Sequence, residues 1–223
     1  MPAESPLRAG QYDNLELIET FRFDPELGFV RLGRHLARLE ESAKALDFKF
    51  SKRNIEAKLN APGSARRSLR VRLTLNAKGE IGLTSQPFAA LPPDTIWRLE
   101  IAETRLSSTD PLLRHKTSRR ELYDKARAEF SRDEADEVLL LNENDEVCEG
   151  TITSLFIQTP RGDFITPALH CGLLAGVLRQ EMLEEGKAKE AHISATDLTS
   201  ASAIFVGNSL RGLIRATFDN NRL

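Results

Sequence analysis

The sequence lacks the features of membrane, secreted and nucleic-acid-binding proteins. No apolar run approaches the roughly 20 residues of a membrane-spanning helix, and the first ten residues are polar, unlike a signal or transit peptide. With 31 basic and 33 acidic side chains, the net charge of -2 provides no field that attracts nucleic acid. Cys148 and Cys171 are the only cysteines. Two thiols without a secretory signal favour a reducing compartment, so we expect a cytoplasmic protein without nucleic-acid or membrane partners.

The usual nucleotide and metal motifs are missing as well. Neither G-x-G-x-x-G nor G-x-x-x-x-G-K-[ST] occurs, so dinucleotide and P-loop nucleotide binding have no support. No C-x-x-C exists, and the four histidines fall at no metal-ligand spacing, so we expect no metal site. His170 and Cys171 are neighbours in the chain, but adjacent residues in a turn point apart, which argues against a thiol nucleophile at this position.

The first half of the chain alternates strands and helices of ordinary length. Residues 15–23 and 69–75 show the alternation of half-buried strands. Between them, apolar residues recur at the spacing of one helix face, and Ser51 is suited to cap a second helix that buries Ile55 and Leu59. The residues of the first helix face are Leu36, Leu39, Ala43 and Leu46.

The second half begins after a stretch without periodicity, residues 103–114, which we take as a domain linker. A helix is expected over residues 118–130, with Leu122, Ala126 and Phe130 on its apolar side. Residues 138–141 form a continuous apolar run, as in a strand covered on both faces. A last helix should start near residues 172–175 and end at Gly186. The sequence thus predicts an α+β protein with domains at 1–105 and 106–223.

Three segments together resemble the class IV aminotransferases, a pyridoxal-phosphate-dependent family that includes aminodeoxychorismate lyase and branched-chain and D-amino-acid aminotransferases. They are the runs RLGRHLARLEESA at 31–43, RHKT at 114–117 and EGTITSLF at 149–156, the last followed by Thr166-Pro167 and GLLAGVLR at 172–179. Each motif alone is weak, but their order and separations are fairly specific. The resemblance runs from about Leu15 to the end. It implies a smaller N-terminal α+β domain, a C-terminal mixed α/β pseudo-barrel, the cofactor in the cleft between them, and a homodimer.

The resemblance also assigns roles to individual residues. Lys116 matches the lysine that bonds covalently to the cofactor aldehyde and then acts as the base at the substrate carbon. Glu149 matches the glutamate that keeps the pyridine nitrogen protonated. Donors to the cofactor phosphate are expected from the Arg38 side chain, from the helix start at Gly176 and Val177, and from Ser209. Taken alone, each of these residues is more often an ordinary surface or turn residue.

The sequence departs from the family pattern at three places. Ser154 stands where the family has an asparagine, and Glu121 stands where branched-chain enzymes have a tyrosine, with Tyr123 two residues later. The segment that begins at Leu15 also lacks the strand and hairpin that usually come before it, an abbreviated start. The short start and Ser154 are the only support for a catalytically idle relative.

Further details resemble aminodeoxychorismate lyase, which converts 4-amino-4-deoxychorismate to 4-aminobenzoate and pyruvate for folate synthesis. They are the segments ETFR at 19–22, LRVRL at 69–73 and NSLRGL at 208–213. The lyase substrate carries two carboxylates, and Arg72 and Arg211 are suited to bind them bidentately. A transaminase acting on branched-chain or D-amino acids would use the same lysine, glutamate and phosphate residues, so it remains an alternative. In either case the partner is a small amine or amino acid.

Overall fold

The computed structural model describes residues 14–218, which fall into two compact units. The N-terminal unit contains residues 14–90 and 115–119, and the C-terminal unit contains residues 91–114 and 120–218. The chain therefore leaves the first unit after Ala90 and returns to it for a short segment around Lys116. The boundary expected between residues 105 and 106 falls inside strand β5 (Ile96–Leu106) of the C-terminal unit. None of the helices in residues 14–218 is long and apolar enough to cross a membrane.

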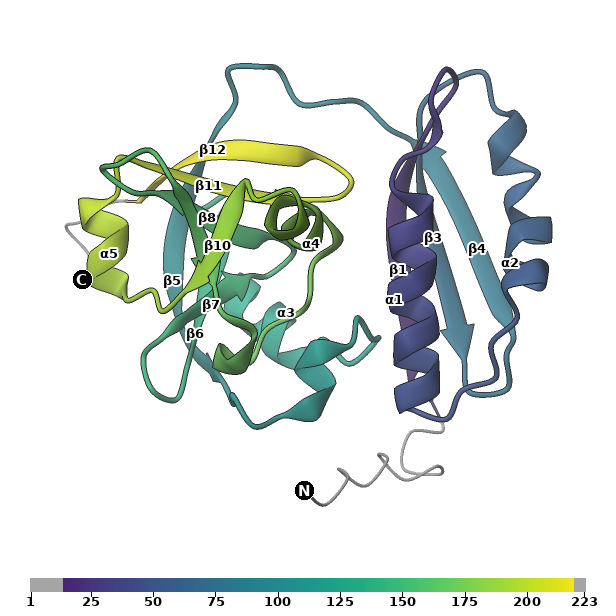
Figure 1. Ribbon diagram of the computed structural model, residues 1–223, viewed down its shortest axis with the longest axis horizontal. Coiled ribbons are helices and arrows are strands. Elements are labelled where there is room, and N and C mark those ends of the chain that lie inside the picture. Colours follow the sequence, from purple (N-terminus) through teal and green to yellow (C-terminus); the bar gives the residue numbers. More distant parts are fainter. Residues whose placement is uncertain (1–13, 219–223) are drawn as a thin grey trace. The chain divides into compact units, whose positions relative to one another are not determined.

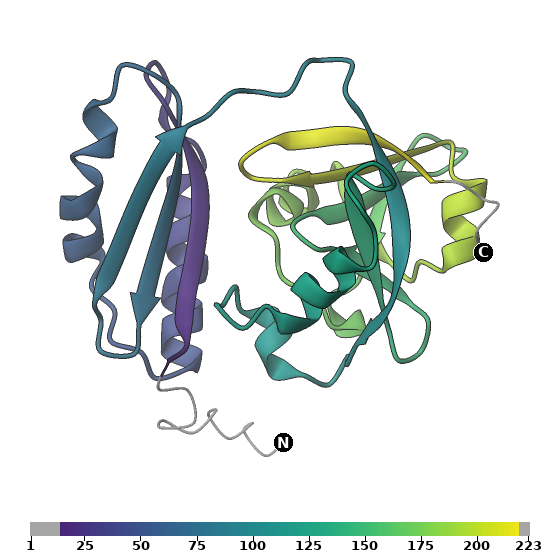
Figure 2. The ribbon, with the colours of Figure 1, turned by 180° about the vertical axis from the view of Figure 1, so that it is seen from behind.

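The N-terminal unit is an antiparallel sheet, in the order β2-β1-β3-β4, with its two helices on one face (Figure 1). Figure 2 shows the other face, with β1, β3 and β4 in front of these helices. The predicted alternation of β3 is confirmed, since Val71 and Leu73 are fully buried between more exposed neighbours. The elements are β1 (Glu16–Asp24), β2 (Gly28–Phe29), α1 (Leu32–Ala45), α2 (Lys52–Leu59), the 3-10 turn η1 (Pro62–Ser64), β3 (Leu69–Asn76) and β4 (Ile81–Pro87).

The two helices form where the apolar spacing predicted them. The four residues of the predicted α1 face are all buried, and they lie against β1. Helix α2 begins at Ser51, whose hydroxyl accepts the Asn54 N–H at 3.4 Å, as expected of a capping serine. Ile55 and Leu59 are buried on the inner side of α2. Local sequence therefore determines the framework that supports β1.

The C-terminal unit is built on a curled sheet in the order β10-β9-β8-β11-β12-β5-β6-β7. Its described strands are β5 (Ile96–Leu106), β6 (Glu137–Asn142), β7 (Val147–Gly150), β8 (Ser154–Gln158), β9 (Phe164–Pro167), β10 (Ala188–Ala191), β11 (Ala203–Asn208) and β12 (Gly212–Phe218). Its helices are α3 (Glu121–Ala128), α4 (Val177–Glu184) and α5 (Ala195–Ser200), and its 3-10 turns are η2 (Pro111–Arg114) and η3 (Leu169–Cys171).

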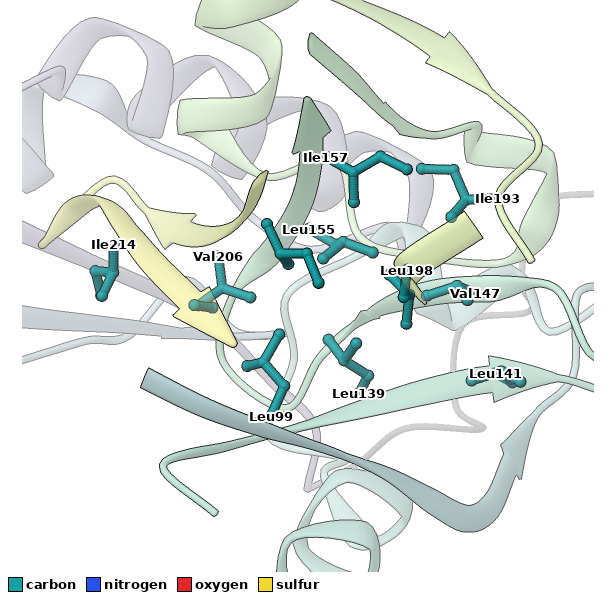
Figure 3. Packing of buried hydrophobic residues seen from close by; sticks show 12 residues of the cluster. Leu99, Leu139, Leu141, Val147, Leu155, Ile157, Ile193, Leu198, Val206 and Ile214 are labelled. Atoms are coloured by element: carbon teal, nitrogen blue, oxygen red, sulfur yellow. The ribbon is translucent and has the colours of Figure 1, made fainter. Parts of the chain in front are cut away.

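Strand β6 is buried on both faces, as its apolar run predicted. Leu139 and Leu141 point into the core enclosed by the curled sheet, which Figure 3 shows. Val138 and Leu140 point to the opposite face, where they pack with Ala126 of α3. Because successive side chains of a strand alternate between its faces, a four-residue apolar run serves two separate cores.

The two edges of the curled sheet meet at a seam beside Val147. The Val147 N–H donates to the Ile193 carbonyl at 2.8 Å, just beyond the end of β10, and Glu146 pairs with Ser194 as an isolated bridge. Strands β7 and β10 lie at opposite ends of the sheet order, so these bonds nearly close the sheet into a barrel. The residues on either side of the seam are thereby held at fixed positions.

Two segments differ from the sequence-based prediction. The stretch expected to be a linker begins within β5, whose pairing with β6 shifts register between Ile101 and Arg105. Helix α3 starts at Glu121 rather than Ser118, because Thr117 forms a bridge with Leu17 of β1. Its apolar side also differs: Ala126 is buried, but Leu122 is exposed.

Candidate active site

Glu149, the expected partner of a pyridine nitrogen, is held in place by two donors. It lies at the end of β7 and is buried. Its Oε1 accepts a hydrogen bond from the Tyr123 hydroxyl at 2.8 Å and another from the Leu174 N–H at 3.1 Å. A carboxylate fixed by a phenol and a backbone amide has a defined orientation, as a partner of a planar cationic ring requires.

Tyr123 supplies the hydroxyl that the motif comparison did not find at Glu121. Glu121 is exposed at the start of α3, whereas the Tyr123 ring is partly buried and lies under the Arg120 guanidinium, 4.8 Å from its centroid. Burial raises the pKa of the Tyr123 phenol well above its usual value, and the negative charge of Glu149 raises it further. The phenol therefore stays protonated and donates to the carboxylate.

A second buried glutamate, Glu137, organises the loop that follows Glu149. It lies at the start of β6 with 1% of its surface exposed. One carboxylate oxygen accepts the Thr151 N–H at 3.1 Å and the Thr151 hydroxyl at 2.5 Å. The other accepts the Ile152 N–H at 3.1 Å and the Thr153 hydroxyl at 2.8 Å. Sequence analysis missed this residue. The donors Thr151, Ile152 and Thr153 follow one another in the sequence. The carboxylate that accepts their hydrogen bonds lies twelve residues before Glu149, so no local spacing connects them.

Gly150 allows the loop after Glu149 to approach Glu137 closely. A Cβ at Gly150 would lie 2.4 Å from the Thr153 hydroxyl and 2.9 Å from the Glu137 side chain. Glycine is therefore required at this position.

The start of α4 offers an anion site next to this loop. Gly176 caps the helix without a side-chain hydrogen bond, and no acidic residue lies in the first turn. The first N–H groups of a helix have no partners within it, and the helix dipole favours negative charge at this end. A Cβ at Gly176 would lie 2.5 Å from the Ser154 Oγ, so Ser154 and the helix start are in close contact. Val177, the first residue of α4, is buried.

The turn between β11 and β12 completes the arrangement in the C-terminal unit. The Asn208 side chain accepts the N–H groups of Leu210 and Arg211 at 3.1 and 3.0 Å, and it donates to the Ile152 carbonyl at 3.1 Å. This links the turn to the loop after Glu149 and holds Ser209, which is buried. The Arg211 guanidinium lies 5.9 Å from the centroid of the Trp97 ring. The fold thus gathers Glu149, the α4 start and the Ser209 turn around one loop.

Lys116 belongs to the N-terminal unit, where it pairs with β1. Its carbonyl accepts the Ile18 N–H at 2.7 Å. On either side, Ser118 exchanges hydrogen bonds with Glu16, and His115 bonds to the Ser42 hydroxyl of α1 at 2.9 Å. The backbone of Lys116 is therefore fixed against the sheet and α1, as a reactive lysine requires.

Arg38 lies in the same unit, in a buried network centred on Glu19. Its guanidinium binds the Glu19 carboxylate bidentately at 2.8 and 2.7 Å, and the His35 Nδ1 approaches the same carboxylate at 2.5 Å. Burial raises the pKa of Glu19, but the Arg38 charge and the two hydrogen-bonding partners outweigh it and lower the pKa to about 2. The ionised carboxylate can only accept, so the Nδ1 of His35 carries its proton.

The charge of Lys116 affects the pKa of the His35 imidazole. Burial lowers the pKa of the His35 imidazole, Glu19 opposes this shift, and the charges of Arg38 and Lys116 lower the pKa further. Lys116 and Arg38 are thus neighbours of one buried network.

Arg72 lies on β3 of the same unit, where it pairs with Thr20 of β1. Side chains of β3 alternate between the two faces of the sheet, and this places Arg72 on the face opposite the helices.

Comparison with known proteins agrees with this arrangement. The sequence matches the family described as amino-transferase class IV over residues 16–217. A Schizosaccharomyces pombe protein named "putative aminodeoxychorismate lyase" is 31% identical over 205 residues, which cover 87% of this chain and 86% of that protein.

Two solved structures are also similar. A "putative amino-acid aminotransferase" from Mesorhizobium loti is 51% identical, with a TM-score of 0.90 over 92% of this chain and 100% of the other. The 4-amino-4-deoxychorismate lyase from Pseudomonas aeruginosa is 27% identical, with a TM-score of 0.77 over 92% and 83% of the two chains. These likenesses confirm the expected fold class, a smaller sheet with helices and a larger curled sheet. The chain belongs to the class IV aminotransferases, a family of pyridoxal-phosphate-dependent enzymes that includes lyases and transaminases.

Proposed function

We propose that this protein is a pyridoxal-phosphate-dependent lyase that converts 4-amino-4-deoxychorismate to 4-aminobenzoate and pyruvate. The observation that carries the cofactor assignment is the gathering of Glu149, the α4 start and the Ser209 turn around one loop. Together they offer an oriented carboxylate and an uncapped helix N-terminus, which match a protonated pyridine nitrogen and a phosphate. Gly176, the N-cap of α4, has no side chain that could cap the helix itself.

The residues of both units have complementary roles in this proposal. Gly176, Val177 and Ser209 would bind the phosphate together with Arg38, whose guanidinium is oriented by Glu19. Glu149 would keep the ring nitrogen protonated, while the Tyr123 hydroxyl holds the Glu149 carboxylate in position. When bound, pyridoxal phosphate supplies a covalent link to Lys116 and an electron-withdrawing ring that stabilises negative charge on the substrate carbon next to nitrogen.

The lyase reaction would give Lys116 two roles. Its Nζ would hold the cofactor between turnovers and, with the substrate amine bound, would take the proton from the carbon that bears this amine. The bond to the enolpyruvyl oxygen breaks, the ring becomes aromatic, and the departing three-carbon unit gains a proton at its methylene carbon to become pyruvate. Atoms and electrons balance without an added oxidant. Arg72 and Arg211 would bind the two substrate carboxylates.

The lyase is favoured by the Schizosaccharomyces pombe relative, which matches over most of both chains. A transaminase is the second candidate, because the Mesorhizobium loti protein is 51% identical and carries an aminotransferase name. The same lysine, glutamate and phosphate residues would serve it. The two reactions differ in one observable property: a transaminase leaves the substrate amino group on the cofactor, whereas the lyase does not.

The test uses purified protein reconstituted with pyridoxal phosphate and incubated with 4-amino-4-deoxychorismate. We expect equal amounts of 4-aminobenzoate and pyruvate, lost in Lys116→Ala and retained in Lys125→Ala, which removes an exposed lysine of α3. If neither product forms while branched-chain or D-amino acids convert the cofactor to its amine form, the protein is a transaminase. If the cofactor does not bind to the wild-type chain, both assignments fail.

The family resemblance also leads us to propose a homodimer, which light scattering on the reconstituted protein would test. A mass of one chain would contradict it. Because both cysteines are free in the structure, we propose a reducing compartment, the cytoplasm, as the site of the reaction.

A further inference from the structure

Three potential metal ligands meet at the seam of the curled sheet. They are a carboxylate oxygen of Glu146, a ring nitrogen of His170 and the sulfur of Cys171, and these atoms all lie within 4.8 Å of one another. Cys171 is buried, Glu146 is half-buried and His170 is exposed, so the cluster opens to solvent on one side. Sequence patterns did not indicate this cluster, because we expected adjacent residues such as His170 and Cys171 to point apart.

The backbone around these ligands is fixed by the seam itself. Glu146 precedes β7 and pairs with Ser194 across the seam. Cys171 ends η3, and its carbonyl accepts the Asn142 side-chain amide at 3.0 Å. The chain then turns at Gly172, which has a positive φ of 86° and packs closely against Ser108, and these contacts restrict the backbone at this position. The ligands are therefore brought together by the fold, before any ion binds.

A second layer of polar groups orients the carboxylate. The Asn142 amide donates to one oxygen of Glu146 at 2.6 Å, and the Nε2 of His192 lies 3.2 Å from the other. Carboxylates and imidazoles that bind metals usually have such outer partners, which set their orientation. His192 also brings a second imidazole to the edge of the cluster.

The donor set selects the kind of ion. A thiolate, an imidazole and a carboxylate suit zinc, whereas calcium and magnesium prefer oxygen ligands alone. In tetrahedral zinc coordination the ligand atoms lie about 3.3–3.6 Å apart, from bond lengths of about 2.0–2.3 Å. Starting within 4.8 Å of one another, the three atoms need to move by only about 1 Å.

A zinc ion at this position would bind the Cys171 sulfur and the Glu146 carboxylate oxygen at once, and the thiol proton would be released to solvent.

We propose that Glu146, His170 and Cys171 form a binding site for zinc or a similar divalent cation, with a fourth coordination position open to water or another ligand. The proposal does not depend on the reaction that the enzyme catalyses. It adds a metal site in the C-terminal unit, between Glu146 just before β7 and the chain segment that leads from β9 to α4.

The test uses the whole chain without an affinity tag, treated with a chelator, kept reduced with a phosphine, and titrated with zinc chloride by calorimetry. X-ray absorption at the zinc edge then reports the ligand atoms. We expect one zinc per chain with one sulfur ligand. The sulfur signal should disappear in Cys171→Ser and persist in Cys148→Ser, which replaces the other buried thiol. His170→Ala changes an exposed side chain and should weaken binding by about tenfold or more.

Three results would overturn the proposal. Zinc bound through nitrogen and oxygen alone in the wild-type chain would be an adventitious ion only. A sulfur signal that persists in Cys171→Ser would place the ion elsewhere. Unchanged affinity in His170→Ala would remove the imidazole from the site, and this variant decides the question even if Cys171→Ser fails to fold.

Discussion

Replacing Glu137 by glutamine tests the proposal that one buried carboxylate organises the loop after Glu149. Glutamine keeps the shape but presents one oxygen and one NH₂ group. The oxygen that accepts the Ile152 N–H and the Thr153 hydroxyl then becomes a donor. The hydroxyl can rotate to accept, but the Ile152 N–H cannot and is left without a partner.

The expected loss of stability is the sum of two effects. A buried donor without a partner costs about 1–3 kcal/mol. The remaining hydrogen bonds to the other oxygen, from Thr151 and from the Val138 N–H, weaken because their acceptor loses its charge. A bond to a charged group contributes about 1 kcal/mol more than a neutral one. We therefore expect Glu137→Gln to lower the free energy of unfolding by about 3 kcal/mol.

Urea denaturation followed by tryptophan fluorescence measures this loss in the relevant unit, because Trp97, the single tryptophan, lies in β5 of the same unit. Glu103→Gln is the matched control, since Glu103 is an exposed glutamate on β5 and its substitution should change the free energy by less than about 0.5 kcal/mol. A loss in Glu137→Gln no larger than that of the control would refute the reasoning.

Three further predictions follow from the described contacts. Gly172→Ala should destabilise the protein by about 2 kcal/mol or more in the same assay. The positive φ of 86° disfavours alanine, and the added Cβ would lie 2.6 Å from the Ser108 Cα. An unchanged urea midpoint would contradict this. The pKa of Glu19 is lowered to about 2 in the fold, so its ionisation contributes about 3 kcal/mol to the free energy of unfolding above pH 4.5, and this contribution is lost as the pH falls towards 2. Glu19→Gln should remove this part of the acid dependence. An identical acid profile in both proteins would argue against the network. Tyr123→Phe should cost about 1 kcal/mol and weaken cofactor affinity, because Glu149 loses one of its donors; a variant with wild-type stability and affinity would show that the hydrogen bond is not needed.

Sequence patterns predicted those parts of the fold that depend on local periodicity. The α1 face, the Ser51 cap and the doubly buried strand β6 each follow from the spacing of apolar residues within one element. The site residues were assigned by family motifs, and their roles remain predictions.

The features that sequence analysis missed arise from contacts between distant segments. Glu137 looks like an ordinary strand-starting glutamate until the fold places Thr151 and Thr153 beside it. The end of β5 was assigned to a linker, although the strand continues to Leu106 past the register shift in its pairing with β6. The Glu146, His170 and Cys171 cluster depends on closure of the seam, which no local spacing indicates.

The most direct test of the central claim is to identify the lysine that bonds to pyridoxal phosphate. The reconstituted protein is reduced with borohydride, which makes the cofactor–lysine bond permanent, and peptides are then mapped by mass spectrometry. We predict a single pyridoxyl group on the peptide that contains Lys116, absent from Lys116→Ala. A pyridoxyl group on another lysine, or one spread evenly over exposed lysines such as Lys125, would contradict the account.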